Sequence, residues 1–321
     1  MQSEKYSREN AGQSLKKYIL LKKGELAYNH GASKYKPFGC CFELKEEEAR
    51  IPYVYHCFAV KENNDKSYIA RLLNNQKIDQ QLKRLISSSV RMDGLLNISY
   101  EEYTGIDLYL PSLPEQQKIA DFLSLVDQRI EKQRQLVESL KKYKRGALSR
   151  VFNDVLETVK LSDISNFISS TRTLSTTLNS NKGIYPVYDA AGIAGYIDHY
   201  DIDSDYITIV KDGSGVGRLQ KCDKKSSFIG TLGALVAKNC TTDFLYAVLQ
   251  TIDFSKFVTG MAIPHIYYRD YKSNLLPFPS EEKQRAISQF FKKFDKCIEN
   301  ETQKLSNMLK YKQGLLQQIF I

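Results

Sequence analysis

Apolar residues recur at helical spacing in two stretches of the chain, residues 111–152 and residues 279–321. In both stretches they fall at steps of three, four or seven positions, with charged residues between them. This spacing predicts a long helix with one apolar stripe, typical of a coiled-coil seam. The seam positions, which are the candidates for helix pairing and partner binding, are Ile119, Phe122, Val126, Ile130, Val137, Leu140, Ile287, Phe290, Phe294, Ile298, Leu305 and Met308.

Prolines mark the start of both helices, at Leu110–Pro114 and at Leu276–Ser280. Proline does not fit inside a helix, so each helix is expected to begin just after it. We expect about 30–35 residues in each, or about 45–50 Å at 1.5 Å per residue. Because rods of this length lack partners inside one globular domain, we predict that the two pair antiparallel. The alternative is two ordinary long helices, each packed on its own core.

The two helices belong to an internal repeat. Shifting the chain by 168 residues aligns residues 87–152 with residues 255–320, and 21 of the 66 aligned positions are identical. Ile119, Asp127 and Ile130 recur as Ile287, Asp295 and Ile298, and Lys-Tyr-Lys recurs at 142–144 and 310–312. The chain is therefore a tandem duplication in which variable and shared regions alternate.

The variable regions mix strand and helix signals. Residues 18–60 and 184–240 alternate strand-like runs with turn residues, whereas residues 68–74, 79–87 and 243–251 have helical patterns. The predicted fold class is α+β, with two mixed domains joined by two long antiparallel coiled-coil helices in a pseudo-twofold repeat. The predicted segments are a first domain at 1–110, a first helical spacer at 111–152, a second domain at 153–278 and a second spacer at 279–321.

The composition is typical of a globular protein. Of 321 residues, 42% are hydrophobic and 26% are charged, which excludes wholesale disorder. The first ten residues lack the basic and apolar regions of a secretory signal. The longest run of small or apolar residues, Ile229–Ala237, is half the length of a membrane span. We therefore expect a cytoplasmic protein.

The sequence contains no pattern typical of catalysis. Its six cysteines form no Cys-x-x-Cys pair and its four histidines are scattered, so we expect reduced thiols and no metal. Paired catalytic carboxylates, a nucleophile elbow and the Asn/Asp-Pro-Pro-Tyr/Phe signature of an amino-methyltransferase are also absent. The sequence therefore predicts a binding protein that holds no cofactor.

The net charge of +9 is spread along the chain, with its densest point at Lys141–Arg145. A moderate basic excess of this kind suits a polyanion that is bound through shaped surfaces rather than through a basic tail. Nucleic acid is one such polyanion.

Three loops are candidates for contact with such a partner. Lys211–Arg218 (KDGSGVGR) matches neither a phosphate loop nor a dinucleotide fingerprint. It is either a flexible hairpin or a loop whose backbone N–H groups, with Lys211 and Arg218, contact phosphates. Ala27–Phe38 mixes aromatic, amide and basic residues, which suits nucleic acid but also an ordinary surface loop.

The third candidate is Gly260–Tyr271, which aligns with residues 92–103 of the first copy. Its repeated tyrosines are expected to be structural, whereas His265 differs from its counterpart Asn97 and is a candidate for ligand contact. The complete set of predicted DNA-binding residues is Tyr28, Asn29, Lys34, Lys36, Arg91, Lys182, Lys211, Ser214, Arg218, Lys221, His265 and Arg269.

The repeated block resembles the conserved regions of type I restriction–modification specificity subunits. The residues that carry the resemblance are Leu113–Leu123 (LPEQQKIADFL), Asp127–Glu131, Leu140–Phe152 and the C-terminal Tyr311–Phe320. Residues 184–271 also resemble one class of target recognition domain. The resemblance covers nearly the whole chain.

The resemblance implies a non-catalytic subunit with two target recognition domains. Each domain reads one half of a split DNA site, and the helices set the unread gap between the halves. Such subunits bind two methyltransferase (modification) subunits, which use S-adenosylmethionine to methylate adenine, and restriction subunits can join the complex.

One departure concerns the first domain, which lacks a counterpart of Val159–Ser165. Either its opening strands are missing or the start lies upstream. This leaves an alternative function, a truncated donor copy with one working recognition domain. A coiled-coil scaffold without a DNA role is a further alternative, and a cryptic methyltransferase is a third.

Overall fold

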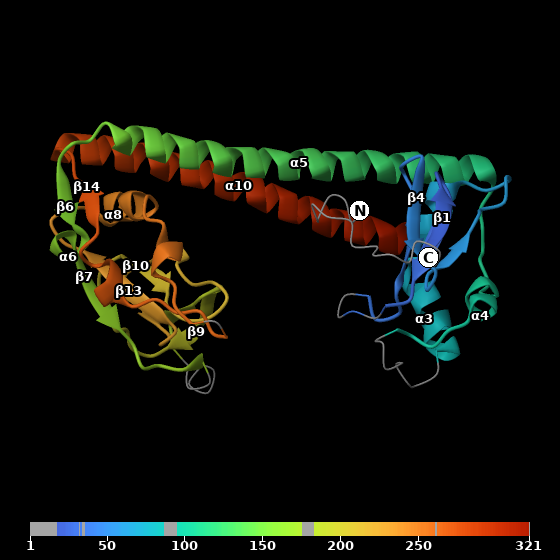
Figure 1. Cartoon of the computed structure of the whole chain (residues 1–321), viewed down its shortest axis with the longest axis horizontal. Coiled ribbons are helices and arrows are strands. Elements are labelled where there is room, and N and C mark those ends of the chain that lie inside the picture. Colours follow the sequence, from blue (N-terminus) through green and yellow to red (C-terminus); the bar gives the residue numbers. More distant parts are fainter. Residues whose placement is uncertain are drawn as a thin grey trace. The chain divides into compact units, whose positions relative to one another are not determined.

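The computed structural model describes residues 18–31, 33, 36–86, 95–174, 183–260 and 262–320, which form two compact units (Figure 1). Unit 1 comprises Met1–Arg134 and Gln303–Ile321, and unit 2 comprises Gln135–Thr302. The two long helices, α5 (Leu113–Asn153) and α10 (Glu281–Ile319), contribute to both units. They contain 41 and 39 residues and so are longer than the 30–35 expected, because each continues through the repeated Lys-Tyr-Lys to the end of the repeat.

Unit 2 is built on a four-stranded antiparallel sheet with β10 (Tyr206–Val210) near its centre. All five residues of β10 are buried, which explains its unbroken apolar and β-branched sequence YITIV. The sheet order is β11 (Leu219–Cys222), β10, β13 (Leu232–Ala237) and β7 (Ser165–Ser169).

Smaller elements complete unit 2. A three-stranded sheet contains β12 (Ser227–Phe228), β8 (Tyr185–Asp189) and β9 (Gly192–Ile197), and a two-stranded one pairs β14 (Leu275–Pro277) with β6 (Thr158–Lys160). The helices are α6 (Leu161–Ile164), α8 (Thr242–Leu249), α9 (Tyr268–Tyr271) and the 3₁₀ turn η2 (Phe254–Phe257). The apolar face of α8 joins a core that also contains Leu148 and Phe152 of α5 and Phe291 of α10.

Unit 1 repeats part of this plan. Its central sheet has the order β3 (Cys40–Glu43), β2 (Leu26–Asn29) and β5 (His56–Phe58), and β1 (Tyr18–Lys22) pairs with β4 (Glu48–Pro52). The helices are α2 (Lys66–Leu72), α3 (Gln76–Leu85) and α4 (Tyr100–Thr104). β2 corresponds to β10 and α2 to α8, since each helix follows a strand that pairs with the central strand, β5 or β13, and has an N-cap side chain, Asp65 or Thr241.

A buried glutamine fixes the entry to each long helix. The side chain of Gln116 donates to the carbonyl of Pro111 at 2.9 Å, and Gln284 donates to Pro279 at 2.8 Å. Both glutamines are less than 10% exposed, and they align in the repeat. The recurring proline and glutamine therefore act together, because the proline turns the chain and the glutamine holds the turn against the first helical turn.

Within each unit, α5 and α10 run antiparallel. In unit 1 the Asp127 carboxylate binds Lys312 at 2.6 Å, and in unit 2 Lys144 binds Asp295. Leu123 of α5 shares a core with Phe320 in unit 1, and Tyr143 stacks on Phe294 in unit 2, at 5.6 Å between ring centroids. The predicted antiparallel pairing is confirmed inside each unit.

Two of the twelve predicted residues lie outside the seam and remain candidates for partner binding alone. Phe122 and Phe290 are 43% and 47% exposed, whereas their neighbours Leu123 and Phe291 are 0% and 2% exposed. Polar residues, among them Lys144, occupy positions of the true seam, so counting apolar residues alone displaces the stripe by one position here. The other predicted seam residues are buried or partly buried: Ile119, Val126, Ile130, Val137, Leu140, Ile287, Phe294, Ile298, Leu305 and Met308.

Replacing Lys144 should destabilise unit 2. Its side chain is 9% exposed and donates to both Asp295 and Gln250, at 2.7 Å for Gln250. Lys144→Met leaves the partly exposed Asp295 without its cation, so we expect a loss of about 2 kcal/mol in urea unfolding. Lys141→Met is the matched control, because the Lys141–Glu138 pair is exposed and should contribute less than about 0.5 kcal/mol. Equal losses in the two variants would contradict this role of Lys144.

Stability should fall in acid through Asp127. Burial raises the pKa of this carboxyl, but the bonds from Lys312 and Arg71 outweigh burial, so the pKa lies below its usual value. The resulting stabilisation is complete above the unfolded pKa of about 4 and is lost as the pH falls towards the lower folded pKa. The urea midpoint should therefore drop below pH 4, and Asp127→Asn should make that drop shallower. An equally steep drop in Asp127→Asn would exclude Asp127 as its cause.

Candidate nucleic-acid interface

Two of the predicted loops occupy equivalent positions in the two units. Residues 30–39 connect β2 to β3 in unit 1, and residues 211–218 connect β10 to β11 in unit 2. A similar contact, from donors two positions apart in the repeat, holds the first residue of each loop: Leu96 N–H donates to the His30 carbonyl at 2.8 Å, and Ile266 N–H donates to the Lys211 carbonyl at 2.9 Å. The sequence indicated the two loops separately, and the sheet topology shows that they are copies of one hairpin.

The backbone of the unit 2 loop is held inside the unit. The N–H of Lys211 donates to Thr231 at 2.8 Å, that of Gly213 to Pro264 at 2.9 Å, and that of Gly217 to Val210 at 2.9 Å. Gly213 and Gly217 have φ angles of +95° and +84°, which explains glycine at both positions. These amides are therefore occupied within the unit, which leaves the side chains and the remaining amides of the loop as the candidates for contact.

The structure brings four predicted residues together around this loop. Lys211, Ser214 and Arg218 lie on the hairpin, and His265 is bridged to Asp212 of the same hairpin. The Arg218 guanidinium also donates to the Ala190 carbonyl at 2.5 Å, which links the loop to the β8–β9 turn. The Nδ1 atom of His265 lies 3.1 Å from the carbonyl oxygen of Ile263.

Arg269 lies beside this group. Its guanidinium carbon is 4.8 Å above the ring of Tyr267, whose centroid is 5.1 Å from that of His265. Tyr267 and Arg269 are both exposed. An aromatic ring with a stacked guanidinium is the kind of surface that contacts bases and phosphates, and sequence reasoning missed Tyr267 because it lies beside the repeated Tyr268.

Lys221 lies elsewhere in unit 2. Its ammonium group binds Asp243 of α8 at 2.7 Å, and Lys292 of α10 binds the same carboxylate at 3.2 Å. Burial raises the pKa of Asp243, but these two lysines outweigh it and hold the pKa below its usual value. The placement favours a structural role for Lys221, because its charge joins β11 to α8, while Lys292 joins α10 to the same carboxylate.

In unit 1, Tyr28 is not a DNA-contacting residue in this structure. It is 1% exposed, its hydroxyl donates to the Phe38 carbonyl at 2.6 Å, and its ring stacks on Tyr103 at 3.8 Å. Burial raises the pKa of Tyr28. The aromatic residue that suggested a binding loop is part of the core, whereas the expectation that the repeated tyrosines are structural holds for Tyr103 and Tyr271, both 1% exposed.

The other described candidates in unit 1 stabilise the base of the loop. The Asn29 side chain accepts from Gly31 N–H at 2.9 Å, and Lys36 donates to the Asn74 carbonyl at 3.2 Å. Of the remaining predictions, Lys34, Arg91 and Lys182 lie outside the described residues.

His30 was missed by sequence reasoning. It is 4% exposed, and its Nδ1 and Nε2 atoms lie 3.0 Å and 2.5 Å from the carbonyl oxygens of Leu96 and Val54. A lone histidine in the sequence carried no signal for this arrangement.

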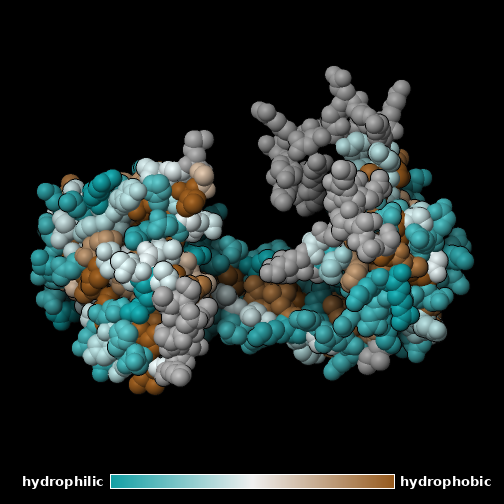
Figure 2. All heavy atoms as spheres, turned by 90° about the horizontal axis from the view of Figure 1, so that it is seen from below, coloured by the Kyte–Doolittle hydropathy of each residue, from teal (hydrophilic) through white to brown (hydrophobic). Residues whose placement is uncertain are grey.

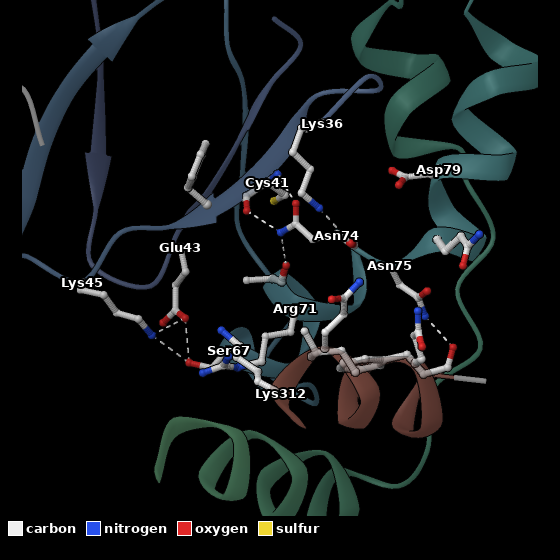
Figure 3. A pocket seen from close by; sticks show the side chains of 17 residues that line it. Lys36, Cys41, Glu43, Lys45, Ser67, Arg71, Asn74, Asn75, Asp79 and Lys312 are labelled. Atoms are coloured by element: carbon white, nitrogen blue, oxygen red, sulfur yellow. Dashed lines mark hydrogen bonds and ion pairs between the residues drawn. The ribbon is translucent and has the colours of Figure 1, made fainter. Parts of the chain in front are cut away.

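A cavity of about 580 Å³ lies in unit 1 against the last turns of α10 (Figure 3). Its cations are engaged within the unit, since Arg71 and Lys312 both bind Asp127, and Lys45 binds Glu43. Lys36 also lines the cavity and donates to the Asn74 carbonyl at 3.2 Å, while Asp79 is a second carboxylate of the lining. No group of three or more potential metal ligands occurs among the described residues.

A family model for the type I restriction modification DNA specificity domain matches residues 13–142 and 153–311. The chain belongs to this family. The two matches correspond to the two copies of the repeat. They support DNA recognition as the function and disfavour the scaffold alternative.

A curated relative from Mycoplasma pneumoniae, described as a candidate type I specificity subunit, is 28% identical over 159 residues. That match covers 47% of this chain and only about half, 52%, of the relative.

Two solved structures share the fold. The S subunit of a type I restriction–modification system from M. genitalium is 17% identical, with a TM-score of 0.60 over 95% of this chain and 85% of that one. A chain from a study of complex assembly and conformational transition of the type I R-M system is 15% identical, with a TM-score of 0.56 over 94% and 82% of the two chains. None of the described helices has the apolar length to cross a membrane.

Proposed function

We propose that this chain is the DNA-reading specificity subunit of a type I restriction–modification complex, with each unit recognising one part of a split target. The equivalent placement of the two hairpin loops carries the proposal, because a duplicated reader with divergent loops suits a target made of two different parts. The chain reads the DNA and leaves catalysis to its partners. We place the complex in the cytoplasm, where the DNA of a bacterial cell lies.

In unit 2, Lys211, Arg218 and Arg269 supply positive charge, while Ser214 and His265 supply neutral polar groups. Arginine and lysine can bind phosphates or guanine edges, and serine can contact either a phosphate or a base. Because the loop backbone is fixed by its own hydrogen bonds, these side chains are presented with little loss of backbone entropy on binding.

Lys211→Ala should weaken binding of the target DNA and lower the slope of log K against log salt by about one. If Lys211 reads a base, specificity should relax at one position of one half-site, at a cost of about 1–3 kcal/mol. Lys296→Ala is the matched control, because this exposed lysine lies on α10 rather than on the loop. Fluorescence anisotropy at several salt concentrations measures both slopes. If the Lys211 and Lys296 variants behave alike, the loop has no special role.

We also infer two methyltransferase subunits as partners, bound along the long helices. A groove of about 610 Å³ in unit 2 is lined by Tyr143, Val151 and Phe290, all exposed. The repeat counterparts of Tyr143 and Phe290, Tyr311 and Phe122, are exposed as well. Figure 2 shows hydrophobic patches interrupting the hydrophilic surface. One apolar site per repeat supports one methyltransferase per repeat.

Those partners would use S-adenosylmethionine, and restriction subunits would join the same complex. Neither role requires a cofactor on this chain.

Phe290→Ser should weaken methyltransferase binding by at least about tenfold, since a buried aromatic anchor contributes about 2 kcal/mol or more to an interface. Ile193→Ser is the control, because Ile193 is similarly exposed at 51% but lies on β9. Calorimetric titration of both variants with the methyltransferase measures the effect. An unchanged affinity of Phe290→Ser would remove the groove from the interface.

Lengthening both helices should lengthen the unread gap in the target. Four residues inserted after Gln133 and four after Gln303 keep the apolar stripe nearly in phase and add about 6 Å to each helix. The gap should grow by about one to two base pairs at 3.4 Å each, with both half-sites unchanged. Sequencing of methylated DNA reads out both properties. An unaltered gap would mean that the length of the helices does not set the separation of the two half-sites.

A further inference from the structure

One segment of unit 2, residues 157–169, covers two strand edges. Its first part pairs with β14, where Phe278 N–H donates to Glu157 at 2.9 Å and Leu161 N–H donates to Asn274 at 3.1 Å. Its last part, β7, pairs with β13. Between them, Leu161 and Ile164 are 0% and 1% exposed in the core.

The corresponding edges of unit 1 are residues 106–110 and β5. The repeat aligns Leu108 with Leu276 of β14. Cys57 of β5 corresponds to Ala234 of β13, because each lies opposite the same position of the central strand, which is Ala27 in β2 and Thr208 in β10.

The backbone of residues 106–110 is bonded on one side only. The Gln81 side chain accepts from Asp107 N–H at 3.1 Å and donates to the Asp107 carbonyl at 3.0 Å. Because successive residues of an extended segment point their backbone groups in opposite directions, those of Ile106 and Leu108 face the other way. No backbone hydrogen bond joins Ile106 or Leu108 to another described residue.

The second edge, formed by β5, is also unpaired on its outer side among the described strands. β5 pairs with β2 alone among the described strands, whereas β13 pairs with both β10 and β7. The first four residues of β13 are buried, but all three residues of β5 are partly exposed. Leu108 is likewise partly exposed, while its counterpart Leu276 is 1% exposed.

We propose that unit 1 binds a strand–turn–strand peptide of the same chemistry as residues 157–169, supplied by a polypeptide other than residues 1–321. Its first strand would pair with residues 106–110, its second strand with β5, and two aliphatic side chains between them would enter the core as Leu161 and Ile164 do in unit 2. Addition of strands to open edges is an established mode of peptide recognition.

The second copy of the internal repeat indicates the chemistry of the bound peptide, because residues 157–169 cover the equivalent surface of unit 2. Residues 1–17 do not fit this description, because their sequence, MQSEKYSRENAGQSLKK, has few apolar residues and lacks the alternation of VKLSDISNFI. The inference concerns unit 1 and does not depend on the DNA contacts proposed for unit 2.

The test uses the full chain and a fluorescent synthetic peptide with the sequence of residues 154–170. We expect saturable binding, and slower hydrogen exchange at the amides of Cys57, Ala59 and Leu108. A peptide carrying Leu161→Asp and Ile164→Asp should bind at least about tenfold more weakly, because both carboxylates would enter an apolar core.

A chain variant tests the strand pairing itself. Ala59 is exposed, and its N–H has no backbone partner among the described residues, so Ala59→Pro should leave the fold intact while removing a donor from the open edge. Ala59→Pro should weaken peptide binding at least about fivefold relative to the Ala59→Ser control.

Three results would each overturn the proposal. The peptide fails to bind, or both peptides bind equally well, or the amides of Cys57, Ala59 and Leu108 are already protected in the free chain. The last result would mean that the chain's own residues close the edge.

Discussion

An ion pair between the two long helices recurs in both units, and we infer that the register of the helical pair depends on it. Asp127 binds Lys312 in unit 1 and Asp295 binds Lys144 in unit 2, and both members of one pair recur in the other. A charged group in an apolar seam is costly unless it meets its partner, so these pairs penalise any other helix register. We infer that the duplication preserves the two pairs because they specify register rather than because they add much stability.

The same register determines what the helices present outward. With Leu123 and Phe291 turned into the two cores, Phe122 and Phe290 are left exposed at equivalent positions. The glutamines that bind Pro111 and Pro279 fix where each helix begins. The helical halves therefore provide rigid supports on which the sheets, and the hairpin loops between their strands, are built.

Sequence reasoning predicted most of the architecture because apolar periodicity and the repeat are strong signals. The buried strand Tyr206–Val210 and the proline-marked helix starts follow from local patterns. The strand Glu48–Pro52 does not follow from a local pattern, because its sequence, EARIP, is polar and its residues are exposed or only partly buried. The predicted seam was displaced at Phe122 and Phe290 because buried polar residues such as Lys144 do not register in an apolar count.

The candidate site was less predictable, because a side chain's role there depends on its partners. Tyr28 and Lys221 are of residue types that often contact nucleic acid, but the fold buries Tyr28 in the core and pairs Lys221 with Asp243. The equivalence of the two hairpin loops also required the sheet topology, since their sequences share no motif.

We propose that one duplicated chain reads two parts of a target at a fixed separation. The most direct measurement is sequencing of adenine methylation in cells that carry only this specificity chain with its methyltransferase. We expect one split motif, with two short defined blocks and a constant number of unread base pairs between them. A single contiguous motif, or the same two blocks at variable separation, would contradict it.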